Sequence, residues 1–133
     1  MKIIREINTK YSIKNAKDVT KYLKEFQDED REHFIVIGLN TKLQPVYREI
    51  AHIGTLNSCV VHVREIFKKA IMMSCKAIII AHNHPSGDTN PSNEDIEITN
   101  KLLEAGKILD IDVLDHIIVG EDSYYSFDEE MLL

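Results

Sequence analysis

A short apolar run that leads directly into two histidines constrains this chain more than any other feature. Residues 77–81 are followed by His82 and His84 in the segment KAIIIAHNHPSGDTNPSNED, which spans 76–95. A short run rich in isoleucine predicts a buried strand, and residues i and i+2 of a strand project from the same face. We therefore expect His82 and His84 to point together and to be able to share one metal ion.

The residues after the histidines predict a loop and then a helix. Pro85 has no backbone donor, and the glycine, aspartate, asparagine and proline at 87–91 are typical of turns. Ser92 stands where a helix cap is expected, and Asp95 follows three residues later in the first turn. Alone, these two residues are an ordinary cap with an acidic first turn. Beside two histidines, Asp95 completes the three ligands of a catalytic zinc site, whose fourth position holds water.

Length and composition predict one cytoplasmic domain. The chain has 133 residues, of which 44% are hydrophobic and 29% charged, so we expect a single domain over 1–133 with its core at about 11–128. No apolar run approaches the roughly 20 residues that span a bilayer. The first residues, MKIIREINTKYSIK, mix charges with apolar residues, unlike a signal peptide. We therefore expect a cytoplasmic location and no membrane partner.

The charge of the chain disfavours nucleic acid as a partner. The formal net charge is −6, and no block of lysine or arginine is dense enough to follow a phosphate backbone. A local basic patch stays possible. The sequence indicates no oligomeric state and no particular substrate.

Apolar periodicity predicts helices and strands in alternation. Helices are expected at 15–26 with Asn15 as cap, at 64–75, and from Ser92 to Gly106, with Gly106 as the glycine that ends the helix. Strands are expected at 34–39, 45–53, 77–81, 113–119 and 124–127. This interleaving predicts an α/β fold: a single-domain mixed β-sheet flanked by helices.

A zinc hydrolase also needs a group that takes a proton from water and gives one to the leaving group, and a carboxylate usually does both. The candidates are Glu32, Glu49, Glu65, Glu94 and Glu97. Glu94 and Glu97 flank the aspartate on its helix and point at least about 100° away from it. Glu65 lies in a first helical turn, where the helix dipole explains it. Spacing alone does not select among the rest.

The spacing around the histidines resembles that of a known enzyme family. His82-x-His84-Pro85, six residues, Ser92, two residues and Asp95 match the zinc signature of the JAMM (MPN+) metalloproteases at every fixed position. From about Tyr11 onward the chain resembles the bacterial RadC family. That likeness is carried by GTLNSCVVHVREIFKKAI, AHNHPSGDTNPSNEDIEIT and LDHIIVG. The resemblance implies a JAMM/MPN domain with cytidine-deaminase-like architecture.

The resemblance also implies a mechanism, the hydrolysis of peptide or isopeptide bonds. Zinc is then bound by the two histidines and the aspartate named above. The general base of JAMM proteins is a glutamate near the start of an early core strand, which here is Glu32, directly before 33–37. Ser92 corresponds to the serine that donates a hydrogen bond to the oxyanion. His116 matches a histidine typical of RadC proteins, and we expect it to support a ligand or the core rather than to act directly.

Two departures from the RadC pattern and two alternative functions remain. Full-length RadC proteins usually carry a helical N-terminal region with helix-hairpin-helix character, and this chain begins almost at the metallo-domain. Val63 also replaces a proline common at the start of the second helix. The alternatives are a DNA-repair-associated accessory protein and a non-catalytic MPN binding module. A nucleobase deaminase is excluded because its Pro-Cys-x-x-Cys motif is missing.

Overall fold

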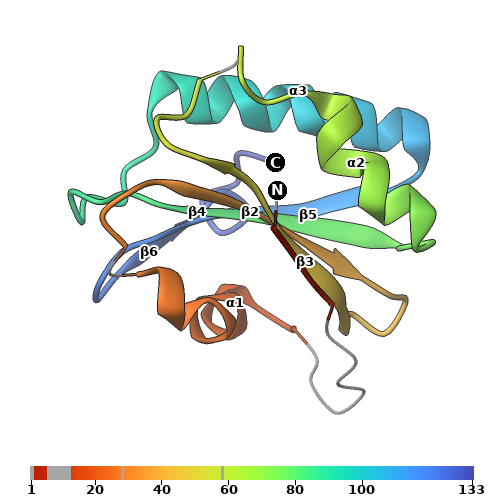
Figure 1. The fold of residues 1–133 in the computed structure, drawn as a ribbon, viewed down its shortest axis with the longest axis horizontal. Coiled ribbons are helices and arrows are strands. Elements are labelled where there is room, and N and C mark those ends of the chain that lie inside the picture. The colour runs from red at the N-terminus through yellow and green to blue at the C-terminus, as the bar shows by residue number, and fades with distance from the viewer. Residues whose placement is uncertain (1, 6–12, 28, 58) are drawn as a thin grey trace.

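A mixed sheet covered by helices on both faces forms the fold (Figure 1). The computed structural model describes residues 2–5, 13–27, 29–57 and 59–133. The strands are β1 (Lys2–Arg5), β2 (His33–Leu39), β3 (Pro45–Ile53), β4 (Ala77–Asn83), β5 (Asp112–Val119) and β6 (Tyr124–Ser126). The helices are α1 (Ala16–Tyr22), the 3-10 turn η1 (Lys24–Phe26), α2 (Val63–Met72) and α3 (Asn93–Leu109). The predicted α/β fold with a mixed sheet is confirmed.

The order of the strands places β4 in the middle of the sheet. The order is β1-β3-β2-β4-β5-β6, and among these described strands only the neighbours β4 and β5 run parallel. Helix α3 makes the connection between them, as a parallel pair requires. All seven residues of β4 are buried, which explains its nearly continuous apolar sequence.

Side chains of β4 alternate between two apolar layers. Ile78 and Ile80 pack in the layer that contains residues of α2 and α3, whereas Ile79 packs in the layer that contains residues of α1. Figure 1 shows α2 and α3 on one side of the sheet and α1 on the other. By the same alternation His82 faces α3, and its neighbour Asn83 faces the opposite side.

The N-terminal part departs from the sequence prediction in two ways. The expected helix 15–26 is divided, because α1 ends at Tyr22 and η1 follows as a separate turn. Asn15 does cap α1, since its side-chain oxygen accepts the N–H of Asp18 at 3.0 Å. Strand β1, which was not predicted, pairs antiparallel with β3.

The prediction that Gly106 ends the third helix is wrong. Helix α3 continues to Leu109, and Asp110 makes the left-handed turn at φ 57°. The chain then folds back onto Gly106, whose carbonyl accepts the N–H of Ile111 at 3.0 Å. A Cβ at Gly106 would lie 2.6 Å from the carbonyl oxygen of Ile111. Glycine is therefore required by close contact and not by its backbone angle.

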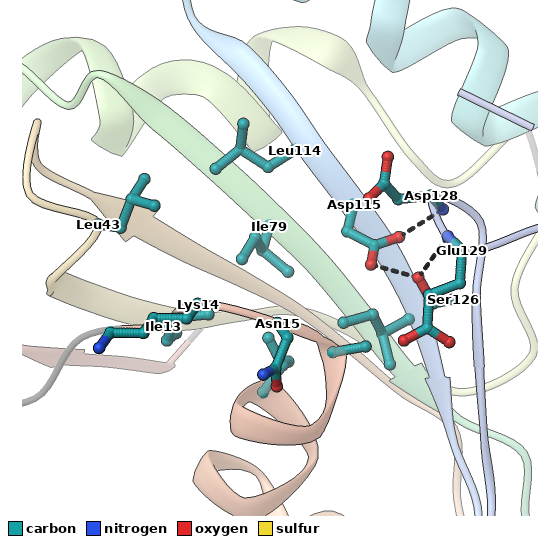
Figure 2. A pocket seen from close by; sticks show the side chains of 13 residues that line it. Ile13, Lys14, Asn15, Leu43, Ile79, Leu114, Asp115, Ser126, Asp128 and Glu129 are labelled. Atoms are coloured by element: carbon teal, nitrogen blue, oxygen red, sulfur yellow. Dashed lines mark hydrogen bonds between the residues drawn. The ribbon is translucent and has the colours of Figure 1, made fainter. Parts of the chain in front are cut away.

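A buried aspartate on β5 fixes the C-terminal turn to the sheet. The Asp115 carboxylate accepts hydrogen bonds from the Ser126 hydroxyl at 2.5 Å and from the Asp128 N–H at 3.0 Å (Figure 2). Burial raises its pKa, although these hydrogen bonds oppose the rise. The group borders a cavity of about 200 Å³ beside the start of α1. The next residue, His116, points to the other face of the sheet.

Candidate metal centre

Two imidazoles meet at the end of β4. His82 is the sixth residue of the strand and fully buried, and His84 follows the last strand residue and is half-buried. Their Nε2 atoms lie 3.0 Å apart. The prediction that the two side chains point together from one face is thus confirmed by the geometry.

The first turn of α3 brings a carboxylate to this pair. The Ser92 hydroxyl accepts the N–H of Asp95 at 3.1 Å, and the Ser92 N–H donates to Asp95 Oδ2 at 2.9 Å, so both halves of a capping box are formed. Asp95 Oδ1 lies 3.3 Å from His82 Nε2, and Oδ2 lies 3.2 Å from His84 Nε2. The cap therefore also aims the carboxylate at the histidines. Ser92 keeps its hydroxyl hydrogen for a further acceptor.

A chain of hydrogen bonds sets the tautomer of His82. The Thr99 hydroxyl donates to the carbonyl of Asp95 at 2.8 Å, so it accepts the Nδ1–H of His116 at 2.5 Å. His116 Nε2 then accepts the Nδ1–H of His82 at 2.8 Å. Burial lowers the pKa of His116 well below its ordinary value, with the adjacent His82 acting in the same direction, and this keeps the His116 ring neutral. The lone pair of His82 is therefore on Nε2, at the meeting point.

His84 is oriented in the same sense by the loop after β4. Its Nδ1–H donates to the carbonyl of Asp88 at 2.7 Å, which leaves the lone pair on Nε2. Both imidazoles thus direct an acceptor atom at the same point, where Asp95 adds carboxylate oxygens. Acceptors this close repel one another unless a positive charge lies between them.

The donor atoms fit a tetrahedral zinc ion. Zinc–ligand distances of 2.0–2.1 Å place tetrahedral ligand atoms about 3.3 Å apart. The two Nε2 atoms lie 3.0 Å apart, Asp95 Oδ1 lies 3.3 Å from His82 Nε2, and Asp95 Oδ2 lies 3.2 Å from His84 Nε2. Burial alone would raise the pKa of Asp95, but the adjacent side chains of His82 and His84 and the hydrogen bond from the Ser92 N–H lower it, so the carboxylate stays charged. Two neutral imidazoles and one carboxylate are the ligand set of several catalytic zinc sites.

Glu32 lies at the edge of this cluster, just before β2. Glu32, His82 and His84 each offer one ligand atom within 4.8 Å of the others. Glu32 Oε1 is 3.9 Å from His84 Nε2, which is longer than a tetrahedral edge. Its other oxygen, Oε2, accepts the N–H of Leu56 at 3.0 Å. At this distance the Glu32 carboxylate lies next to the candidate ligands rather than among them.

The other glutamates considered from the sequence do not join the cluster. Glu49 is buried on β3, and its pKa is raised by burial first, with Lys69 opposing and Glu65 adding to the rise. These charges belong to α2, so Glu49 faces that helix. Glu94 and Glu97 are exposed on α3. Glu32 is the candidate that the structure brings to the histidines.

Three groups that orient the site were missed by the sequence interpretation. They are the Thr99 hydroxyl, the Asp88 carbonyl and the Leu56 N–H. Only Thr99 left a usable signal, because it follows Asp95 by four residues and so lies on the same face of its helix. Its contact with His116 depends on β5 lying beside β4, which local sequence does not reveal.

An open cleft of about 520 Å³ gives access to the Glu32 side of the site. Its lining combines charged residues before β2 with the turn after β3 and the residue after His84: Asp30, Arg31, Glu32, Gly54, Thr55 and Pro85. The cleft therefore lies beside the candidate metal centre.

A mixed α/β sheet with two histidines at the end of its central strand, joined by an aspartate from the following helix, defines a JAB-type domain with a candidate metal site. The sequence model of the RadC-like JAB domain matches residues 13–132. The chain belongs to the RadC-like JAB domain family, and the resemblance inferred from the motifs is confirmed.

Similarity to curated relatives agrees with this assignment. The chain is 47% identical over 126 residues to a UPF0758 protein of Bacillus cereus, covering 94% of the chain and 56% of the relative. It is 51% identical over 119 residues to a UPF0758 protein of Chlorobium chlorochromatii, covering 89% and 54%. It is 53% identical over 111 residues to one of Desulforamulus reducens, covering 84% and 49%. The chain thus spans about half the length of the curated relatives it matches.

Among the described residues, no helix combines the length and the apolar character needed to cross a membrane.

Proposed function

We propose that this domain is a zinc-dependent hydrolase of peptide or isopeptide bonds. The observation that carries the proposal is the convergence of His82 Nε2, His84 Nε2 and the Asp95 carboxylate at separations of 3.0 to 3.3 Å. These three residues would hold the ion. A bound zinc ion supplies Lewis-acid polarisation of a carbonyl and lowers the pKa of water toward neutrality.

The proton transfers are assigned to Glu32. Its Oε2 accepts the Leu56 N–H, and its Oε1 lies 3.9 Å from His84 Nε2. Oε1 takes a proton from the attacking water and then delivers it to the leaving amine. One carboxylate thereby serves as base and acid in turn.

Ser92 is assigned to the developing oxyanion of the substrate. Its hydroxyl oxygen already accepts the Asp95 N–H, so the hydroxyl hydrogen points elsewhere and is available to donate. A preorganised donor of this kind is worth roughly 2.7–4 kcal/mol in the transition state. His116, backed by Thr99, keeps His82 in the tautomer that binds metal.

Two measurements test the proposal. Elemental analysis of the purified chain should find about one zinc per molecule, because the proposed ligands His82, His84 and Asp95 hold one ion. His82→Ala with His84→Ala should lose it, while His62→Ala at the exposed start of α2 should not. A wild-type chain that takes up no zinc would exclude the proposal.

Hydrolysis is tested with a panel of peptides and isopeptide-linked conjugates carrying a fluorophore and quencher. Glu32→Gln should lower turnover about 10²- to 10⁴-fold, the usual contribution of general acid–base catalysis, and keep the zinc, because Glu32 is not a proposed ligand. Glu94→Gln, an exposed glutamate next to Asp95 on α3, removes the same charge and should keep activity. A chain that binds zinc and cleaves nothing in the panel would favour a non-catalytic binding module. Zinc-independent DNA binding would favour the accessory role in DNA repair.

A further inference from the structure

The residue between the two histidines makes contacts that the metal site does not explain. Asn83 is fully buried and projects from the face of β4 opposite to His82. Its Oδ1 accepts the N–H of His33 at 2.7 Å. Its Nδ2 donates to the carbonyl of Arg31 at 2.9 Å and to that of Glu29 at 3.4 Å. The whole amide is used on the segment that leads into β2.

These hydrogen bonds lie where the pairing between β2 and β4 ends. Strands β2 and β4 are antiparallel, and their pairing ends with Phe34 opposite His82. The next pair would be His33 opposite Asn83, but the His33 N–H bonds to the side chain of Asn83 instead. One side chain thus extends the connection between the strands by one residue. It also holds two carbonyl groups that no regular ladder would reach.

The residue held between these contacts is Glu32. Its neighbours Arg31 and His33 are both bonded to Asn83, and its own carbonyl accepts the Gly54 N–H at 2.8 Å. Its carboxylate Oε2 accepts the Leu56 N–H at 3.0 Å. With the backbone fixed on both sides and Oε2 engaged, Oε1 has a defined position 3.9 Å from His84 Nε2.

We propose that Asn83 is the positioning residue for Glu32. In the tripeptide His82-Asn83-His84, the two histidines then place metal ligands on one face of the sheet. Asn83, which projects from the other face, holds the backbone that carries the proton-transfer group. This inference rests on the proposed function of Glu32 as the base. Asparagine suits the place because its amide supplies one acceptor and two donors. Aspartate has the same shape but offers no donor to the two carbonyls.

The test compares Asn83→Asp with a matched control, Asn40→Asp. Asn40 lies at the opposite end of β2, accepts the N–H groups of Lys42 and Gln44 at 2.9 and 3.0 Å, and donates to the Gln44 side chain. Each substitution disturbs one amide network beside the same strand. Only Asn83→Asp should affect catalysis, with kcat lowered about 100-fold, the scale expected for a misplaced catalytic group. Zinc affinity, measured by chelator competition, should change less than about threefold, because every ligand is retained.

A double substitution separates positioning from general stability. If Asn83 acts through Glu32, adding Asn83→Asp to Glu32→Gln should lower the residual rate no further. A further 100-fold loss would overturn the proposal, as would a parallel loss of zinc affinity. If Asn83→Asp does not fold, Asn83→Ala is measured in the same way.

A readout without activity keeps the inference independent of the hydrolase proposal. The Leu56 amide should exchange its hydrogen slowly in the wild type, because it donates to the Glu32 carboxylate. In Asn83→Asp it should exchange at least about 10-fold faster, while in Asn40→Asp it should not. Unchanged exchange at Leu56 in Asn83→Asp refutes the positioning role. Absent hydrolysis by the wild type refutes the function and leaves the exchange result to decide on Asn83.

Discussion

Thr99 allows the orientation of His82 to be tested without changing a candidate ligand. Its hydroxyl accepts the His116 Nδ1–H at 2.5 Å, and both residues are buried. Thr99→Val keeps the shape of the side chain and removes the acceptor. A buried donor left unpaired costs about 1–3 kcal/mol, so the tautomer of His116 that carries its proton on Nε2 becomes competitive.

That change reverses the hydrogen bond between His116 and His82. His116 Nε2–H would donate to His82 Nδ1 across the present 2.8 Å, and the proton of His82 would move to Nε2. Nε2 is the atom that faces His84 and Asp95, so a proton there blocks a metal ligand. Removing the partner that orients a ligating histidine lowers metal affinity about 10- to 100-fold. We expect Thr99→Val to weaken zinc binding by that factor, about 1.4–2.7 kcal/mol.

Chelator competition measures the affinity, and nitrogen chemical shifts of the His82 ring report the tautomer. Thr20→Val is the control, because the Thr20 hydroxyl makes a similar bond to the carbonyl of Ala16, 3.0 Å away, within α1 on the other side of the sheet. It should leave zinc binding unchanged. The reasoning is refuted if Thr99→Val binds zinc as tightly as the wild type, or if His82 keeps its proton on Nδ1 while affinity falls.

Three further substitutions have distinct expected outcomes. Ser92→Ala removes the cap of α3 and should lower the unfolding free energy by about 1 kcal/mol. The same change should lower the rate of hydrolysis about 10²- to 10³-fold, with zinc retained. An unchanged rate would remove Ser92 from the mechanism. Burial raises the pKa of Glu49 above its ordinary 4.5, so its ionisation destabilises the fold as pH rises from that value through the raised one. Within the described part of the chain, Oε1 of Glu49 is buried without a hydrogen-bond partner. Glu49→Gln should thus stabilise the domain by about 1 kcal/mol at pH 7 and not at pH 4. An equal effect at both pH values in thermal melts would contradict this. Gly106→Ala should destabilise the domain by about 1–3 kcal/mol in denaturant titrations, because its Cβ would lie 2.6 Å from the Ile111 carbonyl oxygen. This cost should exceed the gain from the higher helix propensity of alanine. A stabilised variant would show that the contact relaxes.

Local patterns were sufficient to predict the part of the site that is local in sequence. Strand alternation indicated that His82 and His84 share a face, and the cap pattern indicated that Asp95 begins a helix at Ser92. These residues lie within 14 positions of one another along the chain and are held by one strand, one loop and one helical turn. Short-range geometry therefore determines how they meet.

The remaining contacts depend on how distant elements pack, which periodicity does not report. Glu32 was selected through a family resemblance, because spacing alone did not choose between Glu32 and Glu49. The hydrogen bond that His82 donates to His116 requires β5 to lie beside β4. Strand β1 was not predicted because KIIR has only two apolar residues between two charges. Its strand conformation depends on antiparallel pairing with β3 and not on a pattern in its own sequence.

This division between local and distant contacts has a consequence for assays on the domain. The three proposed ligands come from one continuous segment. The proposed base lies before β2, and it is held by Asn83 of that segment and by Gly54 and Leu56 in the turn after β3. Damage to those distant contacts should move Glu32 and leave zinc in place. Zinc content alone is then a poor measure of an intact active site. Hydrolysis and exchange of the Leu56 amide are the measurements that follow the position of Glu32.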